Sequence, residues 1–184
     1  MRIWHSTIHG RRVAIAVAAL GLLAPPAAAT TIAPASFTEM ASQSHVIVHG
    51  RVETVRSQTR GDRRTIESLV TVAVIESLKG SPSASVVFRV PNGRVGRYRR
   101  VMVGAPEFRE GDEVVLFLKG AAPAIPAPFG LAQGVYRVAG TRGQRLVTPL
   151  VPDPGRLVRG DPARRPLSLE AFGRAVREAL ERRP

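Results

Sequence analysis

The chain of 184 residues contains no cysteine. That absence excludes a disulfide framework, a thiolate nucleophile, a cysteine-based zinc site and a lipid-attachment cysteine behind a signal peptide. A domain without cross-links must be stabilised by its apolar core, and 184 residues with 44% apolar content are enough to form one. We therefore expect a single globular domain that holds neither a metal ion nor an organic cofactor.

Acidic residues, lysines and aromatic residues are also scarce. Asp+Glu number 14 against 27 Lys+Arg, the lysines are Lys79 and Lys119 alone, and aromatic residues make up 5% of the chain. The net charge of +13 has two explanations that the sequence leaves open: the bias of a GC-rich coding sequence, or selection for an anionic partner. The shortage of rings on which bases could stack disfavours single-stranded nucleic acid as that partner.

The first 29 residues have the pattern of a secretory signal peptide. Basic residues precede an apolar run over residues 13–24, and Ala27, Ala28 and Ala29 form a small-residue cleavage site. A helix of that run spans about 18 Å, too short for the ~30 Å core of a bilayer, which disfavours an uncleaved anchor. The pair Arg11-Arg12 leaves twin-arginine export as an alternative. We expect cleavage after Ala29, a periplasmic or extracellular location, and no membrane span afterwards.

Apolar alternation predicts a series of β-strands after the signal peptide. The strongest run is 65–80, TIESLVTVAVIESLKG, whose second face is partly apolar as well, as in a strand at the centre of a sheet. Its inner face, which would line a curled sheet, carries Ile66, Val70, Val72, Val74 and Leu78. Further strands are expected at 46–52, 86–90, 113–118, 134–138 and 144–148, the last two as a hairpin.

Other residues indicate where a strand bends, where a loop lies and where the two helices begin. Gly50 within the first strand predicts a bulge, and the polar segment 57–64 predicts an exposed loop. Ser36 is expected to cap a short helix, and Ser168 an amphipathic one that packs on the β-domain rather than on a membrane. The expected division is a signal peptide over 1–29, a β-domain over 30–148, and a Pro/Arg-rich wrap with the C-terminal helix over 149–184.

Histidines and carboxylates offer little for catalysis. His45 and His49 lie on one expected strand, about 13 Å apart at ~3.3 Å per residue, so they cannot share a metal ion and we expect both to be exposed. No G-x-S-x-G or H-E-x-x-H motif is present, and Glu110 and Asp112 belong to a polar turn. The sequence favours a protein that is not an enzyme, with a hydrolase as an alternative.

The densest cationic stretch after the signal peptide is 93–102, GRVGRYRRVM. Guanidinium groups beside an aromatic ring suit phosphate or carboxylate recognition, whereas the alternative is a solvated strand edge on which arginines discourage aggregation. A second arginine group falls in the polar loop 57–64. The candidate anion-binding or partner-binding residues are Arg94, Arg97, Tyr98, Arg99, Arg100, Arg60, Arg63 and Arg64.

These patterns together predict a mainly β protein, a small, partly closed antiparallel barrel of five or six strands with a helix at each end. The succession VIVHGRV, VTVAVIESLKG, VVFRVPNG and GDEVVLFL resembles the strands of OB-fold domains of the netrin-like type, which include the tissue inhibitors of metalloproteinases. It is also similar to exported bacterial proteins with a GLAQGVYRV-like hairpin. Those inhibitors chelate the protease zinc with an N-terminal cysteine that this chain lacks, so the resemblance implies the fold alone.

The function expected from the sequence is that of a non-enzymatic, secreted or periplasmic binding module. Its partner would be an envelope protein or an anionic polymer, recognised through the basic surface. Alternatives are a single-stranded nucleic-acid-binding OB domain, a hydrolase and a protein that resembles a protease inhibitor.

Overall fold

The computed structural model describes residues 34–61, 65–141, 143–150 and 165–182. The chain divides into the units Met1–Ile32 and Ala33–Pro184, and all described residues belong to the second. The expected signal peptide, Arg63, Arg64 and most of the expected wrap lie outside the described residues.

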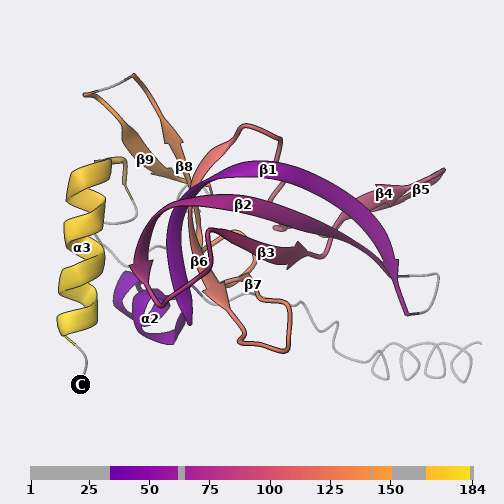
Figure 1. Ribbon diagram of the computed structural model, residues 1–184, viewed down its shortest axis with the longest axis horizontal. Coiled ribbons are helices and arrows are strands. Elements are labelled where there is room, and N and C mark those ends of the chain that lie inside the picture. The colour runs from indigo at the N-terminus through magenta and orange to yellow at the C-terminus, as the bar shows by residue number, and fades with distance from the viewer. Residues whose placement is uncertain (1–33, 62–64, 142, 151–164, 183–184) are drawn as a thin grey trace, which may run out of the picture. The chain divides into compact units, whose positions relative to one another are not determined.

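The described residues form antiparallel β-structure and two helices (Figure 1). In chain order the elements are α2 (Phe37–Gln43), β1 (Val46–Arg60), β2 (Thr65–Lys79), β3 (Ser85–Val90), β4 (Gly93–Val95), β5 (Tyr98–Arg100), β6 (Glu113–Lys119), β7 (Ala127–Pro128), β8 (Val135–Ala139), β9 (Leu146–Pro149), β10 (Leu167–Ser168) and α3 (Leu169–Glu181). The main sheet has the order β10-β9-β8-β6-β1-β2-β3, with β7 beside β6, and β4 and β5 form a separate two-stranded ribbon.

The prediction of a mainly β, antiparallel fold with a short first helix and a C-terminal helix is confirmed. The predicted barrel is wrong in strand number and in closure. The described part of the chain contains ten strands, and its main sheet is open, with β3 and β10 at its two ends. Strands of two or three residues, such as β4, β7 and β10, are too short for a period-two pattern to reveal.

The first strand is longer than the sequence indicated, because the polar segment 57–64 is not all loop. β1 continues to Arg60 and β2 begins at Thr65, and these two residues are paired. Ser57 pairs with Ser68, and their Oγ atoms lie 3.1 Å apart. Polar side chains that bond across the ladder therefore replace the apolar alternation on which the strand prediction depended.

β1 and β2 curve together across the molecule (Figure 1). The register of the pair shifts between His49 and Gly50, which confirms the predicted bulge. A Cβ atom at Gly50 would lie 2.4 Å from the carbonyl oxygen of Ala73 on β2. The two backbones approach so closely at the bend that only glycine fits.

The concave face of the curled sheet encloses one of two apolar clusters. Of the predicted inner wall, Ile66, Val70 and Val72 are buried and Val74 packs at the margin, as expected. Leu78 instead packs against the other cluster, because the register shifts and twist of the long β1–β2 pair turn its far end to the opposite face. The buried members of the concave cluster are Val48, Val52, Val70, Val72, Phe88, Val90, Val114, Leu116, Leu118 and Val135.

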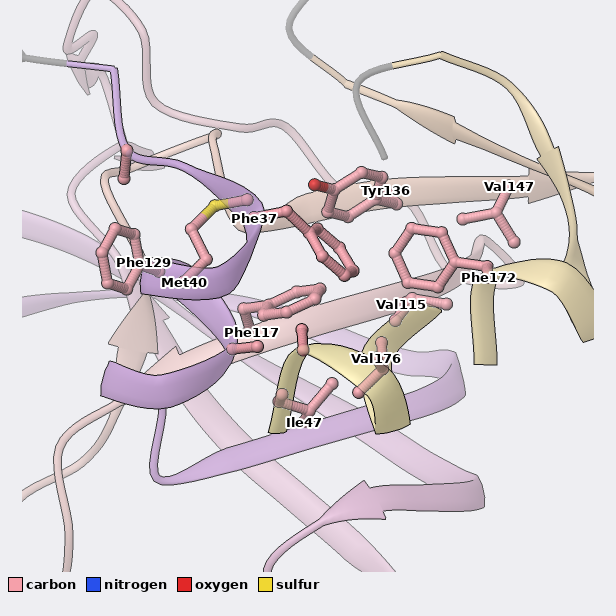
Figure 2. Packing of buried hydrophobic residues seen from close by; sticks show 13 residues of the cluster. Phe37, Met40, Ile47, Val115, Phe117, Phe129, Tyr136, Val147, Phe172 and Val176 are labelled. Atoms are coloured by element: carbon pink, nitrogen blue, oxygen red, sulfur yellow. The ribbon is translucent and has the colours of Figure 1, made fainter. Parts of the chain in front are cut away.

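The second cluster lies between the sheet and the two helices (Figure 2). Phe117 of β6 lies at its centre, with ring centroids 5.5 Å from Phe37 of α2, 5.6 Å from Tyr136 of β8 and 6.2 Å from Phe172 of α3. Edge-on contacts, such as those of Phe117 with Phe37 and with Phe172, add to the free energy gained by burial. The helices thus cover the face of the sheet opposite the concave cluster.

Both helices begin at the predicted serine caps. Ser36 Oγ accepts from the Glu39 backbone N–H at 3.1 Å, and Ser168 Oγ accepts from the Ala171 N–H at 3.2 Å. The apolar stripe of α3 is buried at Phe172, confirming that this helix packs on the β-domain. No helix in the described part of the chain has the length and apolar character that crossing a membrane requires.

Candidate functional site

The predicted arginine stretch forms the ribbon of β4 and β5, which extends beside the far end of β1 and β2 (Figure 1). Its base is held by the polar end of that pair. Ser57 Oγ accepts from the Arg94 backbone N–H at 3.0 Å, and Ser68 Oγ donates to the Asn92 carbonyl at 2.8 Å. Ser57, from the segment predicted to be a loop, and Ser68 on β2 therefore position the ribbon.

Two arginines of the ribbon are direct cross-strand partners, Arg94 on β4 and Arg99 on β5. Residues paired in this way present their side chains on the same face, where like charges repel. Arg99 has a weak, exposed contact with Glu107, 3.5 Å from nitrogen to oxygen. Among the described residues Arg94 makes no ion pair with any carboxylate. This face of the ribbon consequently carries uncompensated positive charge.

Arg97 and Tyr98 form a stack at the turn of the ribbon. The Arg97 guanidinium lies 5.0 Å from the centroid of the Tyr98 ring and donates to its hydroxyl at 2.9 Å. Arg100 differs from its neighbours, because it is half-buried and its Nη1 donates to the Ile66 carbonyl at 3.4 Å. Arg100 therefore anchors the ribbon to β2, and Arg94, Arg97 and Arg99 are the arginines that face solvent.

A cavity of about 330 Å³ lies between the ribbon and the curled sheet. This volume falls within the range of ~300–1,000 Å³ that is usual for ligand pockets. Among the residues that line it, the apolar floor includes Val70, Val90 and Phe108, and the cationic rim consists of Arg94, Arg99 and Arg100. Phe108 is the aromatic side chain of the 104–112 loop, and its ring centroid lies 5.2 Å from that of Phe88. The cavity thus joins an apolar floor to a positively charged opening.

The structure places one more predicted residue near this site. Arg60 ends β1, shortly beyond Ser57, which contacts the ribbon, and its Nη1 lies 4.0 Å from Glu67 Oε2. Arg63 and Arg64 lie outside the described residues. The structure therefore brings the two arginine groups of the sequence, as far as it describes them, to the same end of the β1–β2 pair.

His49 is not exposed, contrary to the prediction, because only 2% of its surface is accessible. The alternation along β1 places it on the same face as Ile47, and the helices cover that face. Its Nε2 lies 2.6 Å from Oε1 of Glu113 on β6. The expected exposed face of the first strand is therefore buried at this position.

Two arginines contact the carboxylate of Glu113. Arg51 Nη2 lies 3.1 Å from its Oε2, and Arg145 contacts its Oε1. Burial first, and then the positive charges of Arg145 and Arg51, lower the pKa of His49 below its ordinary 6.5, while Glu76 acts to raise it. The imidazole is thus neutral near pH 7, and its Nε2–H donates to Glu113.

The buried His49, the largely buried Glu113 and two arginines that are more exposed form a structural junction between β1, β6 and the β8–β9 hairpin. A neutral imidazole of which only 2% is accessible is not placed to contact a substrate. A second cavity, of about 390 Å³, adjoins Arg145, but Glu76, Glu170 and Arg177 also line it, so its charges are mixed. Within the described residues no group of His, Cys, Asp or Glu is placed to hold a metal ion. The sequence shows that His49 shares a face of β1 with Ile47, but it carries no signal of what covers that face.

Comparison with protein-family models, curated proteins and solved structures found no match. The geometry of the ribbon and its cavity therefore carries the functional argument.

Proposed function

We propose that this protein is a non-enzymatic, secreted or periplasmic binding module that binds an anionic polymer or surface of the cell envelope through the ribbon of β4 and β5. The observation that carries this proposal is the direct cross-strand pairing of Arg94 with Arg99 above the cavity. Repulsion between the two guanidinium groups costs free energy in the unbound protein. An anion placed between them removes that repulsion and gains charge-assisted hydrogen bonds.

The chemistry of the site favours phosphate or carboxylate groups in a repeating array. Arg94 and Arg99 can each present a planar fork of donors to two oxygens of such a group. Arg97 at the turn extends the positive surface, and within the cavity lining Glu107 supplies the opposing negative charge. Binding dominated by exposed charges weakens steeply as ionic strength rises.

We further infer that the scaffold is OB-like, of the netrin-like type. Supporting this inference, the order β3-β2-β1-β6-β8 within the main sheet is the order of the five strands of an OB barrel, opened between its third and fifth strands. A solution structure in which β8 does not neighbour β6 would remove the inference.

The test measures equilibrium binding of polyphosphate and of poly-glutamate at low and high salt. The double variant Arg94→Ser/Arg99→Ser should weaken binding of the preferred polymer at least about tenfold, since each hydrogen bond to a charged group contributes ~1.5–3 kcal/mol. The matched control is Arg174→Ser/Arg182→Ser on α3, which removes the same charge from exposed helix positions. Its affinity should stay within about twofold of wild type.

Equal losses in the two double variants would mean that only net charge matters, and the ribbon would then have no special role. Tighter retention of a single-stranded oligonucleotide than of polyphosphate would favour the nucleic-acid alternative instead.

A further inference from the structure

The ribbon and the residues after it expose apolar side chains as well as arginines. The exposed fractions are 61% for Tyr98, 65% for Val101 and 92% for Val103. Exposed apolar residues elsewhere in the described chain, such as Ile75 on β2 and Ile125 in the loop before β7, come from separate elements. Apolar exposure is therefore concentrated in one short segment, 98–103, beside the positive charge.

We infer that this segment docks on a bilayer that contains anionic phospholipids. In the docked protein, Tyr98, Val101 and Val103 enter the interface between headgroups and acyl chains while the arginines contact lipid phosphates. The inference rests on the proposed function. It identifies phospholipid headgroups as the source of the anionic groups that the arginines bind. A soluble polymer of phosphates would satisfy the arginines but would leave both valines in water.

The charge and the apolar groups are complementary to such a surface and to few others. Basic residues next to an anionic leaflet each contribute to binding, and tyrosine favours the headgroup level because its ring is apolar and its hydroxyl polar. Either contribution alone gives weak attachment, and charge combined with inserted apolar groups gives firm but reversible attachment. The segment lies on the membrane and does not cross it.

The position of the ribbon allows this docking. β4 and β5 extend away from the helices, at the opposite end of the described β-structure from α3 (Figure 1). Their base is fixed by the bonds of Ser57 to Arg94 and of Arg100 to Ile66. A membrane could therefore contact the ribbon while the apolar cluster under the helices stays intact.

The first measurement is co-sedimentation with vesicles of phosphatidylcholine alone and of phosphatidylcholine mixed with phosphatidylglycerol. We expect binding to the mixed vesicles and little to the neutral ones. Val101→Ser/Val103→Ser should lower the partition coefficient by about tenfold or more, since a fully buried valine gains ~1.5 kcal/mol or more and ~1.4 kcal/mol is a factor of ten. The control Ile75→Ser/Ile125→Ser removes exposed apolar residues elsewhere and should leave binding unchanged.

The second measurement reports the depth of the segment. The sequence has one tryptophan, Trp4, so Val103→Trp in a Trp4→Phe background places a single indole at the most exposed valine. Its emission should shift to the blue with mixed vesicles and should stay unchanged with polyphosphate. Mass spectrometry should verify that all variants share one N-terminus, so that any contribution from residues 1–29 is common to them.

The outcomes separate this inference from the function on which it rests. Polyphosphate binding that depends on Arg94 and Arg99, without binding to mixed vesicles, overturns the membrane inference and leaves the binding module. Vesicle binding that is indifferent to Val101→Ser/Val103→Ser, or an indole that stays in water, also overturns it. Failure to bind either polyanions or mixed vesicles removes both proposals.

Discussion

His49 Nε2 on β1 donates to Glu113 on β6, with 2.6 Å between nitrogen and oxygen, in a position that water scarcely reaches. The two strands meet there beneath the helices, and Arg51 and Arg145 compensate the carboxylate. A neutral histidine beside a carboxylate is stable here because the arginines already supply the positive charge. Protonation of His49 would add a further buried charge to the junction.

Stability should therefore fall when the pH is lowered through the ordinary range of histidine. The folded protein holds the pKa of His49 below 6.5, whereas the unfolded chain binds a proton near that value. The unfolded state thus gains protons first, and the contribution of His49, fully present above ~6.5, decreases below it by at most ~1.4 kcal/mol per pH unit. Urea unfolding at a series of pH values measures this slope.

The difference between wild type and His49→Gln isolates that contribution. His45→Gln is the control, because His45 is exposed and its Nδ1 accepts from the Gly120 N–H. We expect His49→Gln to have the flatter pH dependence and His45→Gln to keep the wild-type slope. Identical slopes for all three proteins would contradict the burial argument.

Two glycines should respond in opposite directions to alanine. At Gly50 the new Cβ would lie 2.4 Å from the Ala73 carbonyl oxygen, so Gly50→Ala should lower the free energy of unfolding by about 2–4 kcal/mol. A Cβ atom at Gly173 in α3 would lie 3.6 Å from its nearest neighbour, the flexible end of Arg177. Gly173→Ala should therefore raise the free energy of unfolding by about 1 kcal/mol. Urea denaturation measures both, and a neutral Gly50→Ala would show that β1 and β2 lie farther apart.

A charge reversal in the ribbon should separate binding from folding. Arg94→Glu replaces a repulsive cross-strand pair with an attractive one opposite Arg99, and should leave stability unchanged or raise it by about 0.5 kcal/mol. The same change should lower polyphosphate affinity more than about tenfold. Thermal unfolding and equilibrium binding of the same sample test this pair of expectations. A variant that binds as wild type does would exclude Arg94 from the site.

Removal of the opposing carboxylate should have the reverse effect on binding. Glu107 lies 3.5 Å from the Arg99 guanidinium, so Glu107→Gln frees that arginine for an external anion. Affinity for polyphosphate should rise about threefold to fivefold, roughly the effect of one charge near such a surface. Glu181→Gln, which removes an exposed carboxylate at the end of α3, should change affinity less. Equal gains in both variants would point to net charge alone.

Local patterns in the sequence predicted most helices and strands. Where these patterns failed, the reason is physical. Periodicity identified the runs now seen as β2, β3, β6 and β8, because buried strands require apolar residues in a fixed alternation. It failed at residues 57–60, where the ladder is stabilised by polar pairs such as Ser57 and Ser68. It failed also at His49, because alternation reports which residues share a face and not what covers that face.

The candidate site was foreseen in its residues but not in its arrangement. The density of arginine around Tyr98 marked the segment, since charge is a property of composition. The opposition of Arg94 and Arg99, the anchoring of Arg100 and the cavity beneath them depend on register and on contacts with β2.

The sequence alone determined that this protein is basic, free of cysteine and rich in antiparallel strands with a capped helix near each end, because these features follow from composition and from contacts between near neighbours along the chain. Tertiary structure decided that the sheet stays open, that His49 is buried against Glu113, and that two arginines face each other above an apolar cavity. Those outcomes depend on which distant segments meet, and the free energy of such encounters is shared among many residues that no local pattern contains.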